Sequence, residues 1–448
     1  MRGLNVLKKL SLAFSIVCVT LLSAADHNLT QEGNSSVIFD AQQMSEQEQR
    51  QATTLDGYLS TLKRQQFGYE YEKADQESSK LRDSWIRPVM LQYSINRSNP
   101  YNDNPLYTGE SENQNAAIAL DQPIFQSGGI IYGIKFASAS REYSNYSIDQ
   151  QKRIMIKQAV DLLMQIKQSE LTLEKQHLQI SNSEINLEQK REQYLNGQLD
   201  SGFLNNAIIE LNVVKQALFD LESRDAQLIA QFKKLSDLDP KEAKIPFLAI
   251  LDEERFLNDN IDIKLAESKS EKDRLYKNTT IVKYLPSVNL QASYNWQKQH
   301  SSFPAGGSLI SNSVETDFYR YGIAASMPLD INAYNDFEAS KVEYLKSLVI
   351  IDDKKRELKL LYDQVMQNLV NFDKKITLAQ ENKLLYDSLL SETTDLFKAG
   401  YKTQYDVDTL SNSVVIEEIN KKIYAIDKQL ELLTLYEKIT NEAPQENE

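Results

Sequence analysis

The residues that could do chemistry in this sequence are few and widely spaced. It contains three histidines, His27, His177 and His300, and one cysteine, Cys18. None of them belongs to an HExxH motif or to the paired spacing that zinc ligands require. The sequence also lacks GxSxG, Walker and GxGxxG motifs, so it offers no nucleophile elbow and no phosphate-binding loop. We therefore expect no catalytic, cofactor-binding or metal-binding residues, and no enzyme activity.

The net charge argues against a second class, the nucleic-acid-binding proteins. The 448 residues carry a formal charge of −14, with 25% charged and 41% hydrophobic residues. Binding through phosphate neutralisation needs clustered lysine and arginine, and the sequence has no long basic run. We expect no nucleic-acid partner. The acidity is compatible with the passage of cations, but a solvated acidic surface is the simpler explanation.

The first 25 residues have the pattern of a secretory signal peptide. Arg2, Lys8 and Lys9 form the basic segment, residues 10–22 the apolar segment, and Ser-Ala-Ala at the end the cleavage site. The apolar segment is shorter than the roughly 20 residues that a transmembrane helix needs. Cys18 lies inside it, so the processed chain would have no thiol. Residues 26–52 and 441–448 are polar and are predicted to be flexible tails.

Two very long helices organise the chain. Residues 127–196 contain no proline, and no glycine after Gly133, while residues 333–399 contain neither. Because proline costs a helix interior about 3 kcal/mol and glycine about 1 kcal/mol, both stretches predict continuous helices. Helices of this length must pack lengthwise on similar helices, since they exceed the width of an ordinary domain.

Both predicted helices end in the same way. Gly197 and Gly400 interrupt them, and Asp200 and Thr403 follow as candidate N-caps of a returning helix. The returning helices, predicted over 203–238 and 404–440, have apolar residues spaced by three and four, which is typical of a coiled-coil seam. The fold class predicted is mainly α, with long antiparallel helical hairpins that form an α-barrel or coiled coil.

Two β-hairpins are predicted as well, over 86–125 and 286–330. In their strands apolar and polar residues alternate for about ten residues, which is the period of a strand with two different faces. This is the length that a tilted strand needs to cross the hydrocarbon of a membrane. Four strands cannot close a barrel or hide the edges of a sheet in lipid, so the chain would have to borrow strands from other copies of itself.

The order helix, β-hairpin, long helix, helix occurs twice along the chain. Pro123 and Pro328 are 205 residues apart, and Gly197 and Gly400 are 203 apart. The agreement of these two offsets predicts an internal tandem duplication. The predicted boundaries are a first repeat over 53–240 with its first helix at 54–83, a linker over 241–252, and a second repeat over 253–440 with its first helix at 253–283.

Aromatic residues cluster in the predicted strands. At the two interfaces of a membrane, tyrosine and tryptophan form belts, and their joint placement near strand ends fits such belts. Any single aromatic residue is explained equally well by the general preference of aromatics for strands. The candidate membrane-interface residues are Tyr93, Tyr294, Trp296, Tyr319 and Tyr321.

These features together resemble the outer membrane efflux protein family, the TolC-like channel tunnels. The resemblance extends over nearly all of residues 53–440. Its most specific parts are Ala-Leu-Asp-Gln-Pro-Ile-Phe-Gln-Ser-Gly-Gly at 119–129 and Ala-Gly-Tyr-Lys-Thr-Gln-Tyr-Asp-Val at 399–407. It implies a homotrimer in the cell outer membrane, with four strands per chain completing a 12-stranded β-barrel in membrane lipid and the helices forming a tunnel in the periplasm. It also implies two partners, a periplasmic adaptor (membrane fusion) protein and an inner-membrane transporter of RND or ABC type.

The resemblance further implies that the hairpin tips lie at the periplasmic entrance and dock the adaptor. The candidate docking residues are Gly197, Asp200, Gly400 and Thr403. Lys402 matches a basic residue that holds neighbouring helices together in relatives. Its acidic partner would fall on Phe203, which departs from the family pattern, and Asp200 is the nearest substitute.

An acidic constriction is the last feature that the resemblance implies. Relatives narrow the entrance with two acidic residues one turn apart, which select cations. Asp406 matches the first position, whereas the second falls on Thr409, with Asp408 beside it. A carboxylate that favours the N-terminus of its own helix, by about 0.3–1 kcal/mol, explains Asp406 equally well.

The function expected is therefore a passive exit duct of a tripartite efflux or type I secretion system. It would conduct substrates from the pump and adaptor to the exterior without a cofactor. The alternative is an exported structural or adhesive coiled-coil scaffold without a pore, which explains the helices but not the two aromatic-bearing hairpins. The sequence does not distinguish a drug, metal, dye or protein as cargo, although the absence of clustered metal ligands disfavours a metal channel.

Overall fold

The computed structural model describes residues 55–98, 111–305 and 308–440. The chain divides into a unit that ends at Gly57 and a second unit that begins at Tyr58. A short 3-10 helix, η1 (Leu55–Tyr58), spans that boundary in the sequence, and the other described helices and strands belong to the second unit. The predicted signal peptide over 1–25 and the predicted tails over 26–52 and 441–448 lie outside the described residues and stay predictions.

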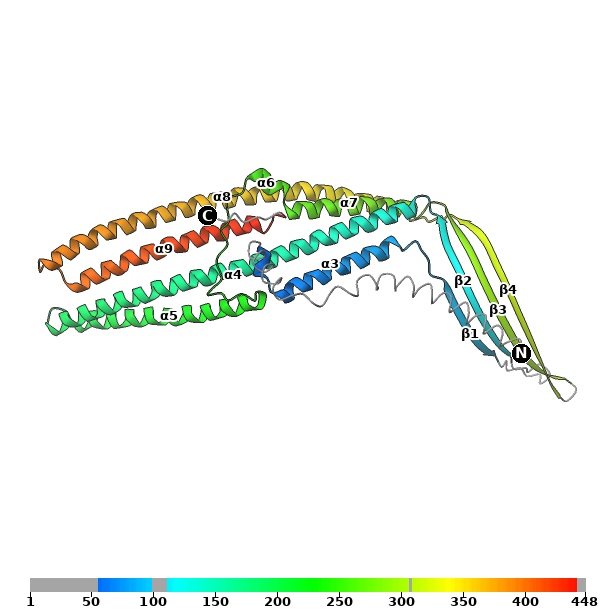
Figure 1. The fold of residues 1–448 in the computed structure, drawn as a ribbon, viewed down its shortest axis with the longest axis horizontal. Coiled ribbons are helices and arrows are strands. Elements are labelled where there is room, and N and C mark those ends of the chain that lie inside the picture. Colours follow the sequence, from blue (N-terminus) through cyan, green and yellow to red (C-terminus); the bar gives the residue numbers. More distant parts are fainter. Residues whose placement is uncertain (1–54, 99–110, 306–307, 441–448) are drawn as a thin grey trace, which may run out of the picture. The chain divides into compact units, whose positions relative to one another are not determined.

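Two long helical hairpins dominate the second unit (Figure 1). Helix α4 (Gly129–Leu195) returns as α5 (Ser201–Leu235), and α8 (Ala333–Lys398) returns as α9 (Gln404–Tyr436). With 67 and 66 residues, α4 and α8 each run for roughly 100 Å. The predicted fold class, long antiparallel helical hairpins combined with β-hairpins, is confirmed.

The shorter helices differ from the prediction. The first one, predicted over 54–83, is α3 (Thr61–Arg82), with Ser60 as its N-cap. The single helix predicted over 253–283 is wrong, because the structure has α6 (Glu253–Asn258) and α7 (Ile261–Val282) in its place.

The break between α6 and α7 combines a local helix cap with tertiary contacts. The side chain of the fully buried Asn260 accepts hydrogen bonds from the N–H groups of Asp262 (2.9 Å) and Ile263 (3.4 Å) and so caps α7. Backbone bonds then tie the break to the C-terminal segment, from Ile261 N–H to Lys438 C=O (2.7 Å) and from Thr440 N–H to Asp259 C=O (2.9 Å). The sequence around residue 260 contains no proline or glycine that would indicate the break.

The four strands form one antiparallel sheet in the order β1-β2-β3-β4. They are β1 (Met90–Ser98), β2 (Ser111–Phe125), β3 (Ser287–Ala305) and β4 (Ser308–Ser326). The two predicted hairpins lie side by side through the pairing of β2 with β3 (Figure 1). The strands β2, β3 and β4 have 15, 19 and 19 residues, so the prediction of about ten was too short. Strand pairing satisfies the backbone of polar segments that look like loops in the sequence.

The pairing register gives the sheet two chemically different faces. One face carries the even-numbered residues of β1 and β4 and the odd-numbered residues of β3 and of β2 as far as Pro123, and we call it the polar face. The opposite face is the apolar face. Serine, asparagine and glutamine predominate on the polar face, and aliphatic and aromatic residues on the apolar face. Both outer edges of the sheet, on β1 and β4, have no partner among the described strands.

Helix α4 is the central helix of the bundle and packs against α3, α5, α7 and α9. Its contact with α5 includes a buried apolar cluster of Leu163, Ile166, Leu228 and Phe232. Within the part of the chain that the structure describes, no helix has an apolar stretch long enough to cross a membrane.

Where α4 meets α9, a row of side-chain hydrogen bonds joins the two hairpins. Side-chain hydrogen bonds recur at seven-residue intervals along α4, which keeps them on the side that faces α9. They join Gln168 to Asp427 (2.7 Å), Lys175 to Asn420 (2.9 Å) and Asn182 to Asn412 (2.7 Å). We call this row of hydrogen bonds the polar seam, and it extends toward the hairpin ends as far as Asn182 and Asn412.

Candidate functional site

The first tip (193–203) and the second tip (396–406) reverse the chain by the same backbone geometry. Gly197 and Gly400 have φ of 75° and 83°, a left-handed conformation that side chains other than glycine rarely adopt. At the first tip Gln198 N–H bonds to Gln193 C=O, and at the second Tyr401 N–H bonds to Leu396 C=O, both at 2.9 Å. Both tips therefore close their long helix with a Schellman motif.

The N-caps that follow the two glycines differ. At the first tip Asp200 Oδ1 accepts one hydrogen bond, from Gly202 N–H at 2.6 Å. At the second tip Thr403 and Asp406 form a reciprocal capping box. Asp406 N–H donates to Thr403 Oγ1 (3.4 Å), while Thr403 N–H donates to Asp406 Oδ2 (3.0 Å).

The predicted constriction residue Asp406 thus has a local structural role. The hydrogen bond from Thr403 N–H holds the pKa of the Asp406 carboxyl below the usual 3.8. The hydroxyl of Thr403 and the charge of Lys402 act in the same direction. Asp406 therefore stays ionised at neutral pH. A capping role and a pore charge are compatible, because only one carboxylate oxygen is committed to Thr403.

The other residues predicted for the constriction are also engaged locally. Asp408 Oδ1 accepts a hydrogen bond from Gln404 Nε2 at 2.6 Å, one turn earlier on α9. Thr409 donates its hydroxyl to the carbonyl of Tyr405 at 2.8 Å. Their roles in a constriction, like that of Lys402, stay predictions.

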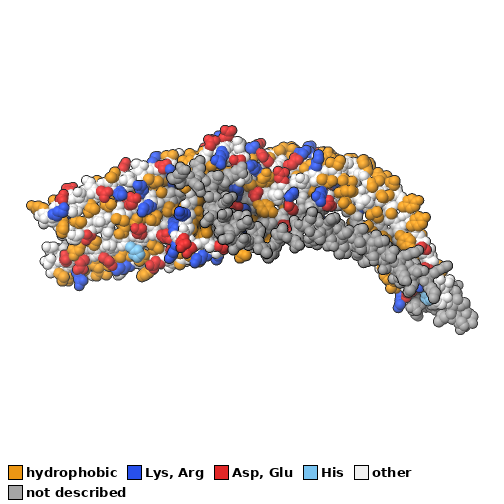
Figure 2. All heavy atoms as spheres, in the orientation of Figure 1, with side chains coloured by type: hydrophobic (Ala, Val, Ile, Leu, Met, Phe, Trp, Pro, Cys, Tyr) orange, Lys and Arg blue, Asp and Glu red, His pale blue; other side chains and the backbone are white. Residues whose placement is uncertain are grey.

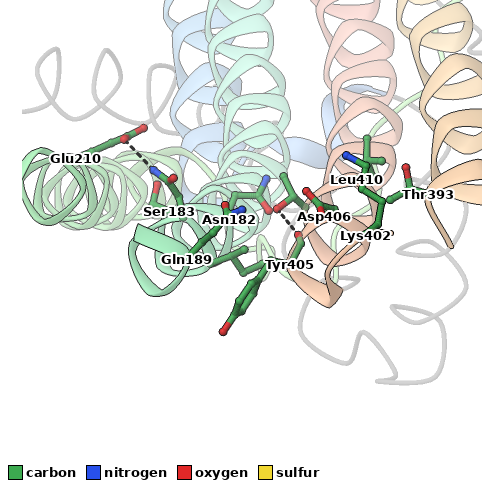
Figure 3. Close-up of a pocket in the computed structure, with 12 residues that line it drawn as sticks. Asn182, Ser183, Gln189, Glu210, Thr393, Lys402, Tyr405, Asp406 and Leu410 are labelled. Atoms are coloured by element: carbon green, nitrogen blue, oxygen red, sulfur yellow. Dashed lines mark hydrogen bonds between the residues drawn. The ribbon is translucent and has the colours of Figure 1, made fainter. Parts of the chain in front are cut away.

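A cleft of about 480 Å³ lies between the two hairpins next to the tips. Residues of α4, α5, α8 and α9 line it, so both hairpins contribute (Figure 3). Neutral amides and hydroxyls predominate, and the charged residues are Glu210, Lys402 and Asp406. Such a lining can form hydrogen bonds with a polar partner, and it contains no nucleophile paired with a base. The neutral polar members include Asn182, Ser183, Asn186, Gln189, Thr393 and Thr409.

One contact at the tips was missed by sequence reasoning. Tyr405, in the first turn of α9, donates its hydroxyl to Glu192 of α4 at 3.1 Å. This hydrogen bond raises the pKa of Tyr405 above its usual 10.0. The two residues are 213 positions apart, so only the packing of α9 on α4 brings them together.

The five predicted interface aromatics lie on the apolar face of the sheet. Tyr294 is paired with Tyr319, and Tyr93 and Trp296 are both paired with Ala116 of β2. Tyr319 and Tyr321 are stacked, with ring centroids 6.3 Å apart, and expose 73% and 81% of their surface. Figure 2 shows hydrophobic side chains gathered over the strands where they approach the helices, whereas acidic and basic side chains are dispersed over the helices.

Charged residues border the aromatics on the apolar face. Tyr294 donates its hydroxyl to Asp317 (3.2 Å), and Trp296 Nε1–H donates to Glu315 (2.7 Å). These contacts place one polar and one apolar side on each ring, as at a membrane interface. The continuous apolar part of the apolar face therefore ends near Trp296. That this part lies in a membrane stays a prediction.

The two histidines in the part of the chain that the structure describes lie on different elements. His177 lies on α4 and His300 on β3, while His27 lies outside the described residues. In the described ranges no group of three or more metal-ligating side chains is present.

Comparison with known proteins supports the fold. No protein-family model matches the sequence, and no curated protein matches it. Solved structures do match: the outer membrane protein VceC from Vibrio cholerae is 13% identical, with a TM-score of 0.62 over 83% of this chain and 92% of that chain. The outer membrane channel CmeC from Campylobacter jejuni is 12% identical, with a TM-score of 0.61 over 86% and 85%. A membrane protein from Pseudomonas aeruginosa is 12% identical, with a TM-score of 0.64 over 90% and 91%. The predicted resemblance to TolC-like outer membrane efflux channels is thus confirmed at the level of the fold.

Proposed function

We propose that three copies of this chain form an outer-membrane channel, the exit duct of a tripartite efflux or type I secretion system. The observation that carries the proposal is the sheet, which has one apolar face bearing exposed aromatics, one polar face, and two open edges. An exposed sheet of this kind is stable in lipid only when its edges are paired and its polar face is turned away from the hydrocarbon. The shared fold with outer membrane channels supports the same conclusion.

The number of strands supports an assembly of several copies, and the resemblance to the TolC-like family supports three. Four strands per chain are too few to close a barrel, while the edges of β1 and β4 can pair with each other between copies. Three copies would supply a 12-stranded barrel, with the apolar face toward lipid and the polar face toward the lumen. Exposed aliphatic residues along α8 would be covered by the neighbouring copies, among them Val342 (58%), Val349 (67%) and Leu360 (60%).

The helical hairpins would then form a tunnel in the periplasm. Their tips, with Gly197, Asp200, Gly400 and Thr403, are the proposed docking sites for a periplasmic adaptor that connects the duct to an inner-membrane transporter. The polar cleft beside the tips supports a hydrogen-bonding contact with that adaptor. The duct itself would conduct substrates passively, and the transporter would supply the energy.

Mass measurement and single-channel recording of the detergent-extracted protein test the proposal. We expect a trimer that inserts into planar bilayers and conducts ions in discrete steps. A monomer or dimer that never conducts would contradict the proposal and favour the exported coiled-coil scaffold. Extraction from the outer-membrane fraction of the cell is the matching localisation test.

A further inference from the structure

The polar face of the sheet is almost free of charge. Its β2 and β3 residues are mainly amides and hydroxyls, such as Asn113, Asn115, Gln291, Ser293, Asn295 and Gln297. In the described strands only two charged side chains lie on this face, Asp121 of β2 and Arg320 of β4. The carboxylate of Asp121 is bonded to the guanidinium of Arg87.

Arg320 has no acidic neighbour on its face of the sheet. It stands opposite Ser293, its guanidinium lies 4.9 Å from the centroid of the Phe318 ring, and the side chain is exposed. The even-numbered residues of β1, which share the polar face, are Met90, Gln92, Ser94, Asn96 and Ser98. If β1 of another copy joined β4 as proposed, any of these β1 residues beside Arg320 would be uncharged.

The surface of the polar face next to Arg320 has no side chain above it at Gly322. Gly322, the next residue of β4 on this face, has no heavy atom within 4 Å of the position that a Cβ would take. Opposite Gly322 stands Gln291, whose amide can donate a hydrogen bond. Along β4, Arg320 therefore lies between the ring of Phe318 and the uncovered backbone of Gly322, and Gln291 beside Gly322 offers an amide donor.

We propose that Arg320, Phe318 and Gln291 bind an organic anion, a carboxylate on an apolar body, on the polar face of the sheet. The guanidinium offers paired donors that match the two oxygens of a carboxylate, and the amide of Gln291 adds another donor. The ring of Phe318 contacts the apolar body. That this site faces a channel lumen rests on the proposed function, whereas the site itself needs only the sheet of one chain.

An arginine on an edge strand has a second possible role, to prevent misdirected pairing of the edge. That role depends on the position of the charge and not on Phe318 or Gln291. The two roles therefore make different predictions for Phe318→Leu, which leaves the edge charge in place.

Binding of 1-naphthoate, a fluorescent aromatic carboxylate, to the detergent-solubilised full chain tests the site directly. Arg320→Gln is expected to weaken binding about tenfold, the loss typical of one charge-assisted hydrogen-bonded pair. Phe318→Leu is expected to weaken it less, about threefold. Lys298→Gln is the matched control, because Lys298 is a basic residue of the same sheet on the apolar face. Equal binding by the Arg320→Gln variant and the unmodified protein, or equal binding of the neutral 1-naphthamide, would overturn the proposal.

Planar-bilayer recording separates this proposal from the proposed function. A unit charge about 10 Å away in water changes the local concentration of an ion roughly twofold, so Arg320→Gln should lower the chloride-to-potassium permeability ratio at least twofold at low salt. Block of the current by 1-naphthoate should disappear in the same variant. Conductance that is unchanged in selectivity and block would overturn the lumen site and leave the duct standing. Arg320-dependent binding without any conductance would support the site and contradict the duct.

Discussion

The two hairpin tips reverse the chain by the same backbone geometry but differ in their N-caps and in their contacts with the other hairpin. Both end their long helix with a left-handed glycine and the same pair of backbone bonds. The first tip then caps α5 with a single bond from Gly202 to Asp200, whereas the second caps α9 with a reciprocal box. Only the second tip reaches across to the other hairpin, through Tyr405 and Glu192. Chain reversal therefore depends only on the local backbone, whereas the second tip also combines capping, charge and a contact between the hairpins.

Replacing the tip glycines with valine is the strongest way to test what the tips share. Gly197→Val and Gly400→Val should each destabilise their tip by roughly 1–3 kcal/mol, because a β-branched residue is strained at positive φ. Faster hydrogen exchange at residues 193–198 and 396–401 measures the loss. Gly68→Ala, inside α3 where a Cβ would meet nothing within 4 Å, is the control and should stabilise its helix. A large effect at one tip only would show that the two reversals are not equivalent.

If Gly400→Val also disturbs the proposed docking surface, crosslinking to the periplasmic adaptor should fall several-fold in cells. Gly68→Ala should leave the crosslinking unchanged. Normal crosslinking by a folded Gly400→Val variant would restrict this glycine to chain reversal.

Removing the N-caps tests the first difference between the tips. Thr403→Ala and Asp200→Ala should each cost about 1 kcal/mol, and Thr403→Ala should cost the larger amount, since it removes one half of a reciprocal box. Chemical denaturation with a probe at each tip is the measurement. An equal loss in the two variants would mean that the box adds nothing to the simple cap.

Asp406→Asn separates the charge of the second tip from its capping. The amide oxygen can still accept from Thr403 N–H, so only the part of the stability that depends on the charge should be lost, while cation selectivity in planar bilayers should fall about twofold for each charge removed. Thr403→Ala should show the opposite pattern, with lower stability and unchanged selectivity. Unchanged selectivity in Asp406→Asn would exclude Asp406 from the constriction.

The pH dependence of Asp406 has a definite sign. Its pKa in the folded chain is lowered from 3.8, chiefly by the Thr403 N–H bond, so its stabilising effect is complete only above about pH 5. The effect should be lost as the pH falls through the lowered pKa, and any cation selectivity due to Asp406 should disappear in the same range. Selectivity that is already lost between pH 7 and pH 5 would have to come from another group.

Tyr405→Phe tests the contact between the tips and should have the smallest effect. The variant loses one hydrogen bond between largely exposed groups, worth about 0.5–1 kcal/mol. Spin labels placed on the two tips should show a broader distance distribution, which Glu192→Gln should reproduce. Tyr401→Phe is the control, because Tyr401 is a neighbouring tyrosine with 80% of its surface exposed. An unchanged distribution in both variants would show that the hydrogen bond between Tyr405 and Glu192 does not hold the tips in position.

Local rules predicted the two long helices and the reversals that follow them, because those rules act within a few residues. Residue types and their positions were enough to identify the proline-free helices α4 and α8, the glycines that end them and the candidate caps Asp200 and Thr403. The prediction failed where a distant segment decides the local structure. Asn260 breaks a helix because it is buried against the C-terminal segment, and β3 continues to Ala305 because β4 pairs with it.

The sequence by itself determined the lengths of the long helices, the positions of the two reversals and the alternation that gives the sheet two faces. Proline, glycine and the two-residue period act through the backbone of the residues concerned. Only the tertiary structure decided that Tyr405 meets Glu192, that β2 pairs with β3 so that the hairpins form one sheet, and that Arg320 stands without an acidic neighbour. Each of these depends on the register between segments far apart in the chain, and register is set by packing that no local pattern specifies.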